Sequence, residues 1–182
     1  HVLIFSVLAL GMVAPHLLAR PHLLAMPLLL VWSANMVRAC EEGRMPRLWL
    51  LGLMVLWANL HGGFTLGIAL TAAFGIEAVL LARDKTEKFL AAKRWGLFLA
   101  LAILAGALTP HGLEGYFFTV EVMGMSYALA NINEWLSPNF QKFQFLELWL
   151  LLLLLAALTK GIRLSPVRLA ILLGLVHLSL KH

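Results

Sequence analysis

The chain has 182 residues, of which 62% are hydrophobic and 13% charged, and its mean hydropathy is +0.89. Soluble domains are about half apolar and about a quarter charged, so a chain of this length has no water-soluble way to bury so much apolar surface. The formal net charge of +5 indicates membrane orientation rather than nucleic-acid binding, and the single cysteine, Cys40, excludes an internal disulfide and any CxxC motif.

The long apolar runs predict an all-α, polytopic transmembrane helical bundle with about six or seven spans, one of them short or broken. The runs are rich in Leu and Ala and show no strand-like alternation. Backbone groups in lipid must be satisfied internally, which favours helices. We expect one transmembrane domain over residues 1–182. In chain order, the expected spans are 2–18, 22–37, 48–60, 64–82, 95–109, 143–159 and 165–180.

The apolar stretch 48–82 is too long for a single straight span. Its 35 residues would form a helix of about 52 Å, whereas a hydrocarbon core is about 30 Å thick. Paired glycines and polar groups in Asn59–Gly63 predict the break. Segment 48–60 then either crosses as a short span or forms a re-entrant or tilted half-helix.

Three further features concern the second half and the start of the chain. The expected outer loop 110–142 contains a helix-like run, Leu113–Met125, which predicts an interfacial or partly buried helix. Ser165 followed by Pro166 predicts a helix start. The chain begins at His1 inside an apolar run without a basic leader, so we expect no signal peptide and the middle or C-terminal part of a longer protein.

The positions of Lys and Arg predict the orientation in the membrane. Eleven of the 14 basic residues fall in the expected loops 38–47, 83–94 and 160–168. These loops should therefore be cytoplasmic in a multi-pass protein of the bacterial cytoplasmic (inner) membrane. The loops 15–22, 58–64 and 110–142 should then face outward, provided that segment 48–60 crosses.

Polar residues gather in the expected outward loops, and ionisable groups at membrane depth often mark function. The candidate substrate-binding residues are Arg20, His22, Asn59, His61, His111, Glu134 and Trp135.

Each candidate has a structural alternative. Arg20 is either a bidentate phosphate ligand or an interfacial anchor. The glycines after Asn59 and His61 either expose amides to an anion or, as Gly63 and Gly67 in a GxxxG pattern, let helices approach closely. Glu134 is the candidate catalytic base or hydroxyl ligand, beside Trp135 as a sugar platform or a belt aromatic. His111 is alternatively a solvated turn residue.

The outer histidines do not predict a metal site. They come from three separate loops and show no HxxxH, HxH or HExxH spacing. We therefore predict no cofactor and no resident metal, with a divalent cation as a secondary alternative.

Four segments carry a family resemblance: Ala19–Leu23, Trp57–Phe64, Thr109–Leu113 and, further along, Glu134–Phe140. Together they resemble bacterial multi-spanning proteins of the GT-C glycosyltransferase-like class, including mannosyltransferase-like and lipopolysaccharide-core sugar transferase-like members. The resemblance implies a polyprenyl-phosphate-linked sugar donor at the outer face, with metal-assisted or carboxylate-assisted transfer in some relatives. The acidic catalytic residue of that class usually lies in an early outer loop that this sequence does not include.

These observations lead to the expectation of a membrane glycosyltransferase. Arg20 and His61 would hold the phosphate leaving group, and Glu134 would orient or deprotonate the acceptor hydroxyl. A transporter or flippase subunit that binds substrate at the break in 58–63 is the first alternative. A membrane scaffold without chemistry is the second.

Overall fold

The computed structural model describes residue 6 and residues 21–125, 138–161 and 163–181. The regular secondary structure in these ranges is helical, which confirms the all-α prediction. The chain divides into two compact units, residues 20–125 and residues 1–19 with 126–182, and each is described by itself.

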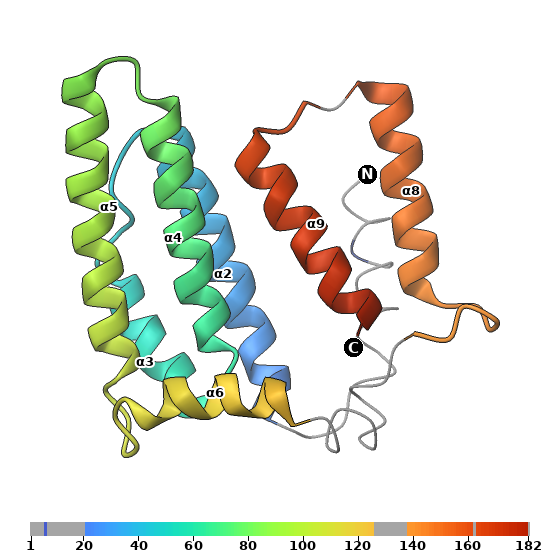
Figure 1. The fold of residues 1–182 in the computed structure, drawn as a ribbon, viewed down its shortest axis with the longest axis horizontal. Coiled ribbons are helices and arrows are strands. Elements are labelled where there is room, and N and C mark those ends of the chain that lie inside the picture. Colours follow the sequence, from blue (N-terminus) through green and yellow to red (C-terminus); the bar gives the residue numbers. More distant parts are fainter. Residues whose placement is uncertain (1–5, 7–20, 126–137, 162, 182) are drawn as a thin grey trace. The chain divides into compact units, whose positions relative to one another are not determined.

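Residues 20–125 form a bundle with one helix lying across its end (Figure 1). α4 packs against α5 and α2, and α3 packs against α5 and α2. α6 lies crosswise where α3 and α5 end and α4 begins, and we call this the α6 end. The helices are α2 (Pro21–Glu41), α3 (Leu50–Leu60), α4 (Phe64–Leu81), α5 (Lys85–Gly106) and α6 (Glu114–Gly124).

Among the residues that the structure describes, three helices are long and apolar enough to cross a membrane. These are Leu23–Glu41 within α2, Phe64–Leu81 and Lys85–Gly106, with 19, 18 and 22 residues. α3 has 11 residues, and at about 1.5 Å per residue it is roughly 16 Å long, too short to cross alone. The expected span 2–18 lies outside the described residues.

A stretch without helical structure joins the end of α2 to the start of α3. α2 ends in a turn at Gly43, whose φ of +62° suits glycine, and the N–H of Arg44 donates to Ala39 O. From there the chain runs along the bundle to α3 (Figure 1). The buried Pro46 lies in this stretch and carries no backbone donor that would need a partner. Residues 42–60 thus lead from the opposite end of the unit to the α6 end.

The predicted basic loop 83–94 is wrong, because α5 already begins at Lys85. The Asp84 side chain accepts from the N–H of Glu87 at 2.8 Å, and Glu87 Oε2 accepts from the N–H of Arg83 at 2.9 Å. This is close to a capping box, in which side chains satisfy the first donors of a helix. The D-x-x-E spacing from Asp84 to Glu87 was a sequence signal for this helix start. The expected loops 38–47 and 160–168 are also partly helical, because α2 extends to Glu41 and a later helix begins at Pro166.

A buried tryptophan joins α2 to α4 and α5. Trp32 is fully buried, and its Nε1 donates to Gly67 O at 2.9 Å and to Thr71 Oγ1 at 3.2 Å. Its ring packs edge-on against Trp57 and tilted against Phe98. Thr71 in turn donates to Gly67 O. A polar contact is therefore satisfied inside an otherwise apolar core, as buried polar groups require.

The second unit contains two apolar helices among its described residues, α8 (Phe145–Lys160) and α9 (Pro166–Lys181). α8 ends at Lys160, and the capping residue Gly161 adopts the left-handed conformation with φ +58°. Ser165 Oγ accepts from the N–H of Arg168 at 3.2 Å, which confirms the predicted helix start at Ser165-Pro166.

Candidate functional site

The seven predicted site residues are unevenly placed in the structure. Arg20, Glu134 and Trp135 lie outside the described residues. His22 lies in the first turn of α2, in agreement with the start of the expected span 22–37, although the expected loop 15–22 also included it. The remaining three, Asn59, His61 and His111, lie at the α6 end of the first unit.

Asn59 connects the end of α3 to the end of α5. Its Nδ2 donates to Val55 O at 2.8 Å, within its own helix, and to Leu108 O at 3.0 Å, just beyond α5. The amide satisfies a carbonyl that has no further helical turn to bond with. This contact gives Asn59 a structural role, the alternative to direct substrate binding.

His61 shapes the turn between α3 and α4. Its Nδ1 accepts from the N–H of Gly63 at 2.9 Å, so Nδ1 is unprotonated and the neutral ring carries its proton on Nε2. The residue is exposed. A Cβ on Gly63 would lie 2.9 Å from Nδ1, so glycine is needed there for the ring to occupy this place.

Beneath this turn lies a buried donor. Trp57 is 1% exposed, and its Nε1 has no hydrogen-bond acceptor in the part of the chain that the structure describes. This nitrogen would lie 3.9 Å from a Cβ on Gly63. A buried N–H without an acceptor lowers the stability of a fold by about 1–3 kcal/mol. The Trp57 indole is therefore a hydrogen-bond donor without an acceptor among the described residues near the α3–α4 turn.

α6 is held against the bundle by two side chains. The Tyr116 hydroxyl donates to Ile103 O at 2.8 Å, and its ring packs edge-on against Phe64. Thr119 Oγ1 donates to Gly115 O at 3.0 Å and, at 3.5 Å, approaches Gly62 O. Burial raises the pKa of the Tyr116 hydroxyl above its ordinary value, so the group stays a protonated donor.

The opposite face of α6 is exposed within the first unit and combines two aromatic side chains with two carboxylates. Phe117 and Phe118 are 72% and 60% exposed, and Glu114 and Glu121 are also exposed. The helix predicted over Leu113–Met125 is present as α6, and its interfacial or partly buried position stays a prediction.

His111 is exposed in the turn between α5 and α6, where its carbonyl accepts from the N–H of Glu114 at 3.0 Å. Within residues 21–125, 138–161 and 163–181, no group of three or more His, Cys, Asp or Glu side chains has metal-binding geometry. The structure therefore brings Asn59 and His61 together at one turn, with His111 at the same end of the unit.

The opposite end contains a cleft of about 570 Å³ that the sequence analysis did not anticipate. We call it the basic-end cleft. One face of α5 lines it through Glu87, Leu90, Ala91, Arg94 and Trp95, whose i, i+3, i+4, i+7, i+8 spacing is readable in the sequence. The remaining lining residues are Cys40, Glu41, Glu42, Gly43, Arg44, Ala78, Leu81, Ala82 and Arg83.

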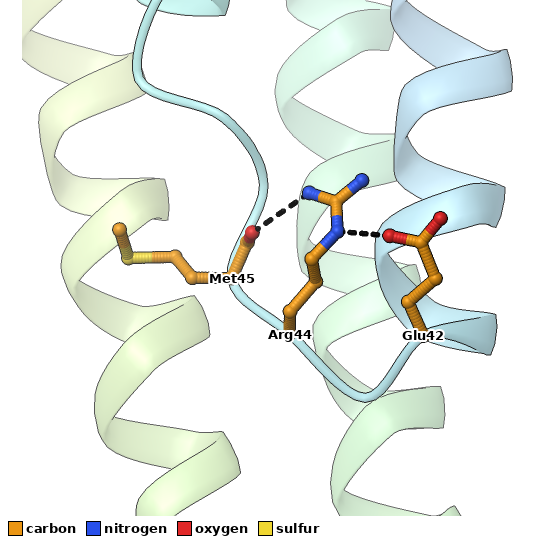
Figure 2. Close-up of polar contacts among 3 residues, drawn as sticks. All are labelled: Glu42, Arg44 and Met45. Carbon is orange, nitrogen blue, oxygen red and sulfur yellow. Dashed lines mark hydrogen bonds and ion pairs between the residues drawn. The ribbon is translucent and has the colours of Figure 1, made fainter.

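Arg44 is held in place at the cleft (Figure 2). Its Nε is hydrogen-bonded to Glu42 Oε2, and its Nη1 donates to Met45 O at 3.3 Å. The Arg44 guanidinium lowers the pKa of the Glu42 carboxyl below its ordinary value, chiefly through this hydrogen bond. The ion pair should therefore remain charged at neutral pH.

Glu77 is the one acidic side chain buried within the described candidate spans, and it is 2% exposed. It lies on α4 next to Ala78 of the cleft lining. Ionisable groups at such depth are costly and are retained mainly where they have a function or a partner.

Comparison of the chain with protein-family models, with curated proteins and with solved structures gives no match. The assignment of a function therefore depends on the residues and their geometry.

Proposed function

We propose that the chain is a multi-spanning protein of the bacterial cytoplasmic membrane that transfers a sugar from a polyprenyl-phosphate-linked donor, in the manner of GT-C-type glycosyltransferases. The α6 end faces outward, and six or seven segments cross, with residues 42–60 crossing as an extended stretch followed by α3. His61 and Arg20 bind the donor phosphate, and Glu134 orients or deprotonates the acceptor hydroxyl.

The observation that carries the proposal is the separation of side chains between the two ends of the first unit. Asn59, His61 and the buried Trp57 indole lie at the α6 end, whereas Arg44, Arg83 and Arg94 line a cleft at the other end. Basic segments favour the cytoplasmic side of a membrane, which leaves the α6 end outside. At that end the exposed His61 lies beside a glycine turn, and an imidazole is a suitable ligand for a phosphate or sugar oxygen.

A transporter or flippase subunit is the second candidate, and one observation favours it. The extended stretch between α2 and α3 is a break in helical structure alongside the bundle, and the buried Glu77 lies on the neighbouring α4. Transporters bind substrates and ions at such discontinuous helices. In that case, Glu77→Gln would abolish substrate movement, whereas the glycosyltransferase proposal assigns this residue no step.

Cysteine labelling tests the orientation. The native Cys40 is 5% exposed and its thiol contacts Phe74 O, so it is a poor reporter and is replaced with alanine. Single cysteines are then introduced at the exposed positions Lys88 and Leu113. We expect a membrane-impermeant maleimide to label Leu113→Cys in intact spheroplasts and Lys88→Cys only after lysis. The reverse pattern, or equal labelling from outside, would contradict the proposed orientation.

Substitutions at His61 and at the two undescribed candidates test the chemistry. Asn at position 61 can keep an acceptor near Nδ1 for the Gly63 N–H but removes Nε2, whereas Gln can replace Nε2. We expect His61→Asn to lower turnover of a radiolabelled polyprenyl-phosphate sugar by about 10-fold or more at unchanged melting temperature, and His61→Gln to keep more activity. Arg20→Ala and Glu134→Ala should lose activity similarly.

Each of these variants has a contrary outcome. Unchanged turnover in both Arg20→Ala and Glu134→Ala would remove these residues from the site. A His61→Asn variant with native turnover would show that this histidine acts only through the turn. The assay uses the intact protein. Lys88→Gln, at the opposite end of the unit, is the control, because it removes a charge and should leave turnover unchanged.

A further inference from the structure

We propose that the basic-end cleft binds the phosphate headgroup of an anionic membrane lipid. This inference rests on the membrane placement within the proposed function but not on sugar transfer. It is carried by the charges that line the cleft, by their hydrogen-bond partners and by the apolar side chains beside them.

The guanidinium groups of the cleft have N–H donors that are not hydrogen-bonded to the described part of the chain. Arg44 is immobilised through Nε and Nη1, while its Nη2 is buried and has no acceptor among the residues that the structure describes. Arg83 and Arg94 line the same cleft, and over the described ranges neither guanidinium forms a hydrogen bond or ion pair. Phosphate oxygens are the acceptors that such planar, charged donors bind best.

The carboxylates of the cleft are less available to a cation. Glu42 is bonded to Arg44, and Glu87 Oε2 accepts from the backbone N–H of Arg83. The cleft has three arginines and three glutamates, Glu41, Glu42 and Glu87, so its formal charges cancel. At least two of these carboxylates, however, already accept hydrogen bonds from the protein itself. The groups in the cleft that are available to a ligand are therefore mainly hydrogen-bond donors.

The apolar lining favours a lipid over a soluble phosphate. Leu81, Leu90 and Trp95 adjoin the charged groups, and Leu81 and Leu90 are 58% and 41% exposed. The cleft lies where α2 and α4 end and α5 begins, which are the termini of the three candidate spans. Headgroups of a bilayer lie at this depth, with their acyl chains alongside the helices. Arg83 and Arg94 line the same cleft as Arg44, whereas interfacial anchors need share no cleft.

The test compares two pairs of substitutions in the full chain, purified in a neutral detergent. Arg83→Gln with Arg94→Gln removes two charges from the cleft, and Lys85→Gln with Lys88→Gln removes two charges from the same helix end outside the lining. The probes are short-chain phosphatidylglycerol and phosphatidylcholine, and native mass spectrometry measures the bound lipid. All four positions are exposed, so folding should be retained, and melting temperatures check this.

We expect phosphatidylglycerol to bind in preference to phosphatidylcholine, and the arginine pair to weaken its binding about 10-fold while the lysine pair changes it less than about 2-fold. If both pairs weakened phosphatidylglycerol binding equally, the effect would be general electrostatic attraction, and the proposed lipid site would be wrong. Unchanged binding in the arginine pair would also overturn it. Complete displacement of the lipid by equimolar inorganic pyrophosphate would reject a lipid in favour of a soluble phosphate. A loss of transferase activity alone leaves all these readouts in place, so the two proposals fail separately.

Discussion

Gly67→Ala is expected to lower the free energy of unfolding by about 1–3 kcal/mol, because its new methyl group has no space. A Cβ at position 67 would lie 2.7 Å from Trp57 Cζ3 and 3.3 Å from Met54 Cε. Trp57 is 1% exposed and rigid, so the ring can move only if α3 separates from α4. Unfolding of the purified protein by SDS, followed by far-UV circular dichroism, measures the loss.

Gly96→Ala in α5 is the matched control. Nothing lies within 4 Å of a Cβ at position 96, so this alanine should be neutral or stabilise the helix by up to about 1 kcal/mol. Both changes add one methyl group to a helical glycine, and only one of them meets a ring. Trp57→Phe in the Gly67→Ala background should recover part of the loss through the smaller ring. Equal stability of the Gly67 and Gly96 variants would refute close packing of α3 on α4.

Trp32→Ala is expected to have the largest effect on stability, a loss of about 3–5 kcal/mol. The side chain is fully buried among α2, α3, α4 and α5, with ring centroids 6.4 Å from Trp57 and 5.9 Å from Phe98. Its removal leaves a cavity and deletes the hydrogen bond to Gly67 O. The same SDS titration measures the loss.

Two further variants divide this effect into packing and hydrogen bonding. Trp32→Phe keeps most of the ring but loses the indole N–H, and should cost about 1–2 kcal/mol, the value of an interhelical hydrogen bond in a membrane. Trp49→Ala removes a tryptophan that is 51% exposed at the start of α3, and should change stability by only about 0.5 kcal/mol. Comparable losses at positions 32 and 49 would show that the core does not depend on Trp32.

The Gly62-Gly63 break shows how far local sequence could predict the site. Paired glycines beside Asn and His indicated a turn, and α3 and α4 do meet there. The sequence did not determine which hydrogen-bond partner each polar side chain at this turn would have. Leu108 lies 49 residues from Asn59 in the chain, so no local pattern could assign the amide to that carbonyl. Of the other candidates, Arg20, Glu134 and Trp135 stay predictions.

The start of α5 shows a different kind of miss. The basic residues of 83–94 favour a loop outside the membrane, because charged groups are costly within a span. The Asp84–Glu87 capping pattern outweighs that reasoning, since it satisfies the first helical donors wherever the membrane surface lies. The consequence is functional, because only a helical 85–94 places Glu87, Leu90 and Arg94 on one face of the cleft.

The sequence by itself determined the helical class, the apolar segments and the glycine breaks between them. These follow from composition, run length and turn chemistry, which act over a few residues. Only the tertiary structure decided that residues 42–60 combine an extended stretch with a short helix, that Gly67 receives Trp57, and that Arg44 meets a cleft formed with α5. Those results depend on side chains far apart in the chain that must fill one another's space, and pairwise packing of this kind leaves no periodic signal.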